Sequence, residues 1–284
     1  MMSPRRINRL LLVPAGAWFI AMLVLPLIVV VVFSFGERGQ AGGYTPAFTL
    51  AQYMNLPARW KAFQNTLTLA PVGTVLVLLI AYPLAYFLAL RVNPKWRMLL
   101  LILVIVPFWT SILIRSYAWI FILGGRGIPS VLDALGLDGI RLINTPFAVL
   151  VGIVYGYLPL MVFPIFVSLE RLDTRLLEAA ADLGAPPWRS FLQITLPLSL
   201  PGVATGCMLV FILLMGEFLI PAMLGGGKVF FVGNALVDLF LQSRNWPFGA
   251  AVAVALVVVM LVTVTLYMRA IRRWGNGRDD VSLM

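Results

Sequence analysis

Long apolar runs are the feature that most limits what this chain can fold into. A helix needs about 20 mostly apolar residues to cross a hydrocarbon layer of ~30 Å. Six runs reach that length, at about Leu11–Phe35, Thr66–Leu90, Met98–Leu123, Phe147–Leu169, Leu198–Leu224 and Phe248–Met268. Because backbone groups in lipid must bond within the chain, and the runs lack the alternation of a β-barrel, each is predicted to be a helix. The expected fold is an all-α integral membrane protein with six transmembrane helices.

Composition supports this prediction. Of the 284 residues, 61% are hydrophobic and 11% are charged, whereas soluble domains carry about 25% charged residues. The basic N-terminus resembles the start of a signal peptide, but the apolar run behind it exceeds the roughly 7–15 residues of a signal core. It is expected to stay as the first helix, and residues 1–284 are expected to form a single transmembrane domain.

Basic residues predict the orientation, because Lys and Arg favour cytoplasmic loops. With both termini on the same side as the second and fourth loops, that side carries thirteen of them and the opposite side seven. The thirteen are Arg5, Arg6, Arg9, Arg91, Lys95, Arg97, Arg171, Arg175, Arg189, Arg269, Arg272, Arg273 and Arg278. Both termini are therefore predicted to be cytoplasmic. The net charge of +10 reflects this topology and attraction to the lipid bilayer, and no nucleic-acid partner is expected.

Several chemistries are excluded by what the sequence lacks. There is no histidine, and Cys207 is the single cysteine, which excludes disulfides, zinc sites and histidine-based catalysis. The segment Gly225–Val229 fails the phosphate-loop pattern, because Ala222 and Val229 replace its first glycine and its hydroxyl residue. The chain is expected to be neither an enzyme nor a metal or cofactor protein, and any ATP would be bound by a partner subunit.

The segment Leu176–Gly202, LLEAAADLGAPPWRSFLQITLPLSLPG, differs from the apolar runs around it. After a cap at Asp173 or Thr174, LLEAAADL is a strong helix former. Gly184 supplies the conformation that ends a helix, and Pro187 suits the first turn of another, which Pro197 is expected to close. On spacing alone, this helix–turn–helix is either a buried connector or a docking surface.

The segment also carries a recognisable pattern. Its residues resemble, position by position, the EAA---G---------I-LP signature of permease subunits of bacterial ABC importers. The matching residues are Glu178, Ala179, Ala180, Gly184, Ile194, Leu196 and Pro197. This resemblance implies the type I importer permease (MetI-like) fold. It also implies that the loop at about 170–197, Asp182 included, docks into a cleft of a cytoplasmic ATPase.

Further segments narrow the resemblance. Pro107–Leu123, Gly216–Gly226 and Asn245–Ala251 look like the corresponding parts of spermidine/putrescine permeases of the PotB/PotH type, within a likeness from about Leu10 to Arg269. The resemblance implies polyamine import across the bacterial inner (cytoplasmic) membrane. It also implies three kinds of partner: two copies of an ATPase, a second related permease, and a periplasmic or lipid-tethered binding protein. Permeases for opines, phosphonates or ferric iron carry similar segments, and an ion-coupled secondary transporter is a weaker alternative.

Two ionisable residues, Arg115 and Glu217, fall inside apolar runs, where charges are costly and often functional. Counted along straight helices from Met98 and Leu198, both rise ~25–29 Å and reach a similar depth. Three interpretations stay open: the two form an ion pair, Glu217 meets a cationic substrate at a gate, or both side chains extend to the headgroups.

Aromatic residues offer a second candidate for the substrate path. Trp109, Tyr117 and Trp119 occur in the third run, and Tyr155 and Tyr157 occur in the fourth. Their rings could contact the ammonium groups of a polyamine. The same residue types also form the aromatic belts at membrane interfaces, so the sequence leaves both roles open.

Overall fold

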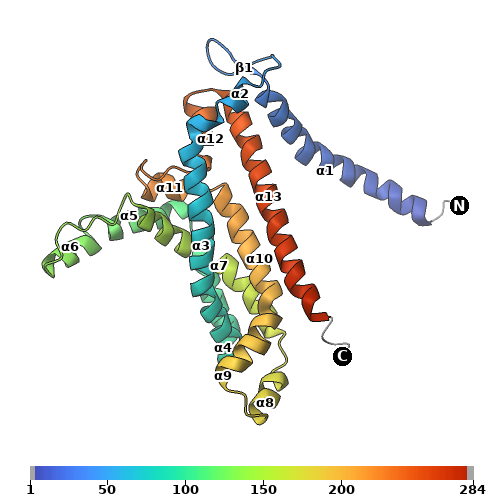
Figure 1. Cartoon of the computed structure of the whole chain (residues 1–284), viewed down its shortest axis with the longest axis vertical. Helices are drawn as coiled ribbons and strands as arrows, with labels where there is room; N and C mark the ends of the chain where they lie inside the picture. The colour runs from blue at the N-terminus through green and yellow to red at the C-terminus, as the bar shows by residue number, and fades with distance from the viewer. Residues whose placement is uncertain (1–3, 280–284) are drawn as a thin grey trace. The chain divides into compact units, whose positions relative to one another are not determined.

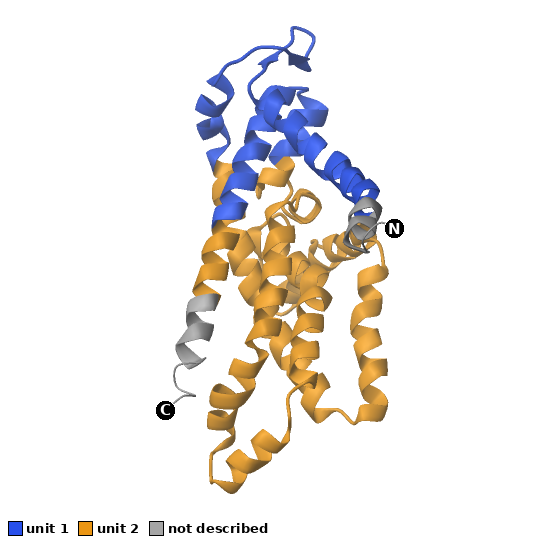
Figure 2. Cartoon of the chain, turned by 90° about the vertical axis from the view of Figure 1, so that its right-hand side faces the viewer, with its two compact units in different colours: residues 1–60, 235–262 blue, residues 61–234, 263–284 orange. Residues whose placement is uncertain are grey.

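The computed structural model describes the backbone of residues 4–279 and the side chains of residues 12–271. Within these residues the regular secondary structure is helical apart from one antiparallel pair of two-residue strands. The chain forms two compact units, of residues 1–60 with 235–262 and of residues 61–234 with 263–284 (Figure 2).

The larger unit, residues 61–234 with 263–284, contains four of the apolar runs. Helix α3 begins at its boundary, and helices α12 and α13 are shared between the two units. Its elements are α3 (Trp60–Tyr86), η2 (Phe87–Arg91), α4 (Pro94–Trp109), α5 (Ile112–Leu123), α6 (Ile128–Ala134), α7 (Pro146–Glu170), α8 (Arg175–Asp182), α9 (Pro187–Ser190), η3 (Phe191–Thr195), α10 (Leu196–Met215), α11 (Leu219–Leu224), α12 (Val232–Val237) and α13 (Trp246–Asp279).

Helix α7 is the centre of this unit. It packs along α10 and also contacts α4, α5 and α11 (Figure 1). Glycines on α10 make the approach possible: a Cβ added at Gly202 would lie 2.5 Å from the Pro164 carbonyl oxygen, and one at Gly206 would lie 2.7 Å from the Met161 sulfur. Helices that pack in lipid rely on such small residues because lipid tails provide no hydrophobic drive for association.

The helix lengths agree with a membrane protein. Among the described residues, five helices are long and apolar enough to cross a bilayer, and six are counted if one bent pair forms a single span. The bent pair joins Pro94–Trp109 to Ile112–Ala134 at an angle of 89°. The third apolar run is therefore not the straight helix that its sequence predicts.

The break in the third run lies at Thr110 and Ser111. Both residues are extended, with ψ angles of 150° and 131°, and the Thr110 hydroxyl donates to the Pro107 carbonyl oxygen at 2.7 Å. Pro107 has no N–H to donate to the preceding turn, which weakens the helix just before it ends. Because Arg115 follows this break, its depth cannot be counted along a straight helix from Met98.

The fifth run also departs from its prediction, at both ends. Pro197 does not close a separate short helix, because α9, η3 and α10 form one continuous helix over Pro187–Met215. The wide π-helical turn Phe191–Thr195, in which the Leu196 N–H donates to the Phe191 carbonyl, precedes this proline and lets the helix continue. At the other end, the helix stops at Met215 and restarts as α11, so the predicted span to Leu224 is broken at Gly216–Phe218.

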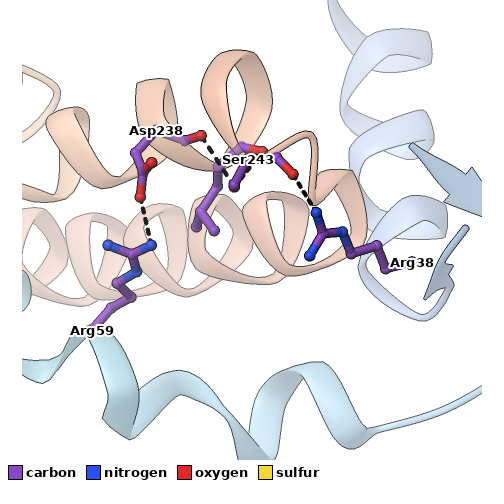
Figure 3. Close-up of polar contacts among 5 residues, drawn as sticks. Arg38, Arg59, Asp238 and Ser243 are labelled. Carbon is purple, nitrogen blue, oxygen red and sulfur yellow. Dashed lines mark hydrogen bonds and ion pairs between the residues drawn. The ribbon is translucent and has the colours of Figure 1, made fainter. Parts of the chain in front are cut away.

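The smaller unit, residues 1–60 with 235–262, gathers several polar and aromatic contacts. The Arg59 guanidinium pairs with the Asp238 carboxylate at 2.6 Å, and Arg38 donates to the Ser243 carbonyl oxygen at 2.7 Å (Figure 3). These contacts join the segment after α1 to the turn before α13. The unit's elements are α1 (Pro4–Ser34), β1 (Glu37–Arg38), β2 (Tyr44–Thr45), α2 (Ala51–Met54), η1 (Leu56–Arg59), η4 (Asp238–Gln242) and the first part of α13.

Replacing Gly202 by alanine is expected to destabilise the larger unit by about 1–3 kcal/mol, because the new methyl group overlaps the α7 backbone. The loss is measured as a lower midpoint of thermal unfolding in detergent. Gly16→Ala is the matched helical control, because a Cβ there meets nothing within 4 Å. Equal midpoints for Gly202→Ala and the unsubstituted chain would contradict this account of the α7–α10 contact.

Candidate functional site

The loop with the EAA pattern lies at the end of α7 and α10 (Figure 1). Helix α7 ends at Glu170, and the Asp173 carboxylate accepts a hydrogen bond from the Arg175 N–H at 3.0 Å, which caps the first turn of α8. Glu178, Ala179 and Asp182 are exposed on α8, and Ala180 is partly exposed. Within η3 and α10, Ile194, Leu196 and Pro197 continue toward the α7 contact.

Gly184 ends α8 in the way that its sequence predicts. Its φ of +78° is in the left-handed region. The Ala185 N–H donates to the Ala180 carbonyl at 2.9 Å, and the Gly184 N–H donates to the Ala181 carbonyl at 2.9 Å. These two bonds are the Schellman motif, which turns the chain sharply and satisfies the last carbonyls of the helix.

Apolar side chains on this loop remain uncovered. Leu183 is 88% exposed, Trp188 is exposed, and no residue of α8 or α9 is buried. The Arg189 guanidinium lies 5.6 Å from the centroid of the Trp188 ring. Exposed leucine and tryptophan beside acidic Glu178 and Asp182 are typical of a surface that a protein partner covers.

At the other end of α10, Glu217 lies in the break before α11. It is only 8% exposed, which excludes the interpretation that its side chain extends to the headgroups. Its Oε1 accepts the N–H groups of Phe218 (3.0 Å), Leu219 (2.7 Å) and Ile220 (3.2 Å), and its Oε2 accepts the hydroxyl of Tyr157 from α7. The carboxylate therefore caps α11.

A second polar side chain supports the same break. Asn234 donates through Nδ2 to the Phe218 carbonyl at 2.7 Å, and its Oδ1 accepts the Phe231 N–H at 3.0 Å. A Cβ added at Gly233 would lie 2.6 Å from the Glu217 carbonyl oxygen, so the start of α12 rests directly on the break.

Helix α3 forms hydrogen bonds to the backbone that leads into α12. The Thr66 hydroxyl accepts the Val232 N–H at 2.9 Å, and Asn65 donates to the Phe230 carbonyl at 3.1 Å. Helix α3 therefore holds the entry to α12, while α7 and α12 contact the break at the end of α10.

Arg115 does not pair with Glu217. The ion pairs among the described side chains are Arg59–Asp238 and Arg97–Glu170. The Glu217 carboxylate is bonded instead to donors in its own break. The Arg115 guanidinium lies 6.0 Å from the Phe108 ring centroid and 5.8 Å from that of Tyr155. Its buried Nε has no hydrogen-bond partner within the described part of the chain.

The aromatic candidates separate into two groups. Tyr155 contacts Trp119 edge-on, with ring centroids 5.8 Å apart, beside Arg115. Trp109 is 80% exposed and lines a groove, whereas Tyr117 is exposed and takes part in none of the ring contacts of residues 12–271.

The groove beside Trp109 has a volume of about 1040 Å³ and lies between α4, α7 and α10. Its walls are mostly apolar, and a few polar side chains lie near the EAA loop. Among its lining residues are Phe108, Trp109, Phe163, Thr205, Arg171 and Asp173.

Sequence reasoning missed Asn234, Asn65 and Thr66 as parts of one network. Their signal was weak but present, since an Asn or Thr in an apolar segment must find hydrogen-bond partners when it is buried. The sequence also predicts only an aromatic role for Tyr157, whereas its hydroxyl is the donor to Glu217.

Known proteins resemble this chain over most of its length. Residues 81–274 match the family described as "Binding-protein-dependent transport system inner membrane component". The spermidine/putrescine transport system permease protein PotB of Haemophilus influenzae is 42% identical over 259 residues, which cover 89% of this chain and 90% of the relative. PotB of Escherichia coli is 40% identical over 267 residues, covering 92% and 97%.

Solved structures share the fold. A chain of the bacterial alginate ABC transporter, in complex with alginate pentasaccharide-bound periplasmic protein, superposes with a TM-score of 0.74 over 94% of each chain. At 19% sequence identity, this likeness concerns the fold alone.

Proposed function

Because the chain belongs to the family of binding-protein-dependent transport system inner membrane components, we propose that it is the permease subunit of an ATP-driven importer of polyamines such as spermidine and putrescine. The names of its relatives support the substrate class. The single observation that carries the importer class is the EAA loop, which is exposed and continuous with a membrane span. Both termini and this loop are assigned to the cytoplasm.

The proposed partners follow from this role. Two copies of a cytoplasmic ATPase bind and hydrolyse ATP, and each contacts an EAA loop. One loop belongs to this chain and the other to a second, related permease. A periplasmic or lipid-tethered protein delivers the substrate, because the predicted outer loops of roughly 30 residues or fewer are too short for a receptor domain.

The continuous helix explains how the loop can act mechanically. Since α9 passes through η3 into α10 without a break, a push on Trp188 or Arg189 moves the whole of α10. An isolated short helix ended by a proline would absorb part of that motion in its turn. The π-helical turn therefore strengthens the proposal that this loop is the lever of the transporter.

Ring faces are the proposed contacts for the substrate. Arg115 already covers one face of Tyr155, and its charge repels a cation there. Trp109 is exposed on the groove and presents a free indole face to a passing ammonium group.

Reconstitution tests the function directly. The complex with its ATPase, second permease and binding protein is expected to take up labelled spermidine when ATP is supplied, whereas this subunit alone is expected to bind no nucleotide. Opines, phosphonates and ferric iron are the competing substrates in the same assay. Uptake of one of these in place of spermidine would overturn the substrate class. Nucleotide binding by the pure subunit would overturn the assignment of ATP binding to the ATPase subunits.

Gly184→Val is expected to leave the chain inserted but to reduce ATPase co-purification by at least about tenfold, because a β-branched residue resists the positive φ of the Schellman turn. The yield of ATPase on the tagged permease gives the measurement. Gly136→Val is the matched control, since Gly136 also has a positive φ of +82° with nothing within 4 Å of an added Cβ. Equal losses with both variants would mean that backbone strain, and not docking, is responsible.

Trp109→Ala is expected to raise the KM for spermidine uptake by roughly 2–30-fold, the range of a cation–π contact of about 0.5–2 kcal/mol. Uptake kinetics in proteoliposomes give the value. Trp96→Ala is the control, because Trp96 is an exposed tryptophan of the same helix outside the groove. An unchanged KM for Trp109→Ala would remove Trp109 from the path.

A further inference from the structure

Glu217 is held by groups of its own chain to an unusual degree. Four donors bind this carboxylate: three backbone N–H groups share Oε1, and the Tyr157 hydroxyl donates to Oε2. The residue is buried, so water does not compete for these positions. A cationic substrate that took over Oε1 would displace backbone donors, which would then be buried without partners.

We propose that Glu217 is a positioning residue that fixes the break between α10 and α11, with Tyr157 and Asn234 as its supports, and that it is not a ligand for the substrate. Its role in transport rests on the proposed function, whereas its role as a helix cap does not. The proposal replaces both the ion pair with Arg115 and the gate contact that the sequence left open.

The break needs such a device because three features leave it weak. Gly216 ends α10, Phe218 has non-helical angles of −133° and −27°, and α11 has only six residues. A helix this short is unstable alone, since its first N–H groups lack partners within the helix. Glu217 supplies an acceptor for three of those groups.

The cap determines where the motion of α10 goes next. Beyond Met215, α10 is joined to the rest of this region by the backbone of Gly216–Phe218 and by the contacts of Glu217 and Asn234. The Tyr157 bond fixes α11 to the central helix α7, and Asn234 fixes the break to the start of α12. A push that travels along α10 is therefore expected to reach α11 and α12 through this cluster.

Hydrogen exchange of the purified subunit tests the cap without any substrate. Glu217→Ala is expected to speed exchange of the Phe218–Ile220 amides by at least about tenfold, because they lose their acceptor. Glu217→Gln keeps the Oε1 acceptor and is expected to stay within about threefold of the unsubstituted chain. Tyr157→Phe, which removes one bond and keeps the ring, is expected to give an intermediate rate. Asp133→Ala, an exposed acid on α6, is the control.

Uptake by the reconstituted complex tests the positioning role. Glu217→Ala is expected to lower the maximal rate about tenfold while the KM for spermidine stays within about twofold, and Glu217→Gln is expected to retain at least about half of the rate. Should Glu217→Ala not fold, Tyr157→Phe carries the same test, with a smaller loss of rate at constant KM.

Two results would overturn the proposal. One is a raised KM in Glu217→Gln with unchanged amide exchange, which is the signature of a charge contact with substrate. The other is unchanged exchange in Glu217→Ala. If the unsubstituted complex moves no spermidine, the proposed function fails, and the exchange experiment still decides the role of Glu217.

Discussion

The close contact between α7 and α10 is the interaction on which the rest of the larger unit depends. Gly202 and Gly206 bring the two helices together so closely that a single methyl group would overlap the facing backbone or side chain. This contact fixes the helix that runs from Pro187 to Met215, a length of about 43 Å at 1.5 Å per residue. The EAA loop lies at one end of that helix and Glu217 at the other, so one rigid element joins the two candidate sites.

Buried polar groups decide where the helices of this unit stop and how they are aligned. A polar group without a partner in an apolar bundle costs about 1–3 kcal/mol, and several polar side chains of this unit find their partners on another element of it. Tyr82 bonds Ser199 at 2.9 Å between α3 and α10, Thr66 accepts the Val232 N–H, and Asn234 bridges Phe218 and Phe231. Apolar packing holds the helices side by side, and these bonds specify the register between them.

The sequence predicts the helices better than their interruptions. Apolar length indicates where a chain can cross lipid. A glycine after a helix-forming segment predicts the helix end, as at Gly184, whose φ is +78°. The break at Thr110 is different, because VPFWTSILI is apolar on both sides and contains no glycine. Pro197 wrongly predicts the end of a helix, because the π-helical turn before it lets the helix continue. Asn234 was overlooked because its partner, the Phe218 carbonyl, is distant in sequence and visible only in the fold.

The two charged residues within the apolar runs, Glu217 and Arg115, differ in their hydrogen bonding. Glu217 accepts hydrogen bonds from its own chain, whereas Arg115 lies near the rings of Phe108 and Tyr155 with a buried Nε that has no partner among the described residues. For the proposed polyamine path, the Glu217 carboxylate is thus occupied, and the Arg115 charge repels a cation. Transport requires binding that is favourable enough for entry and weak enough for release. Ring faces such as that of Trp109 meet this requirement, because a cation–π contact is worth less than an ion pair in a poorly solvated site.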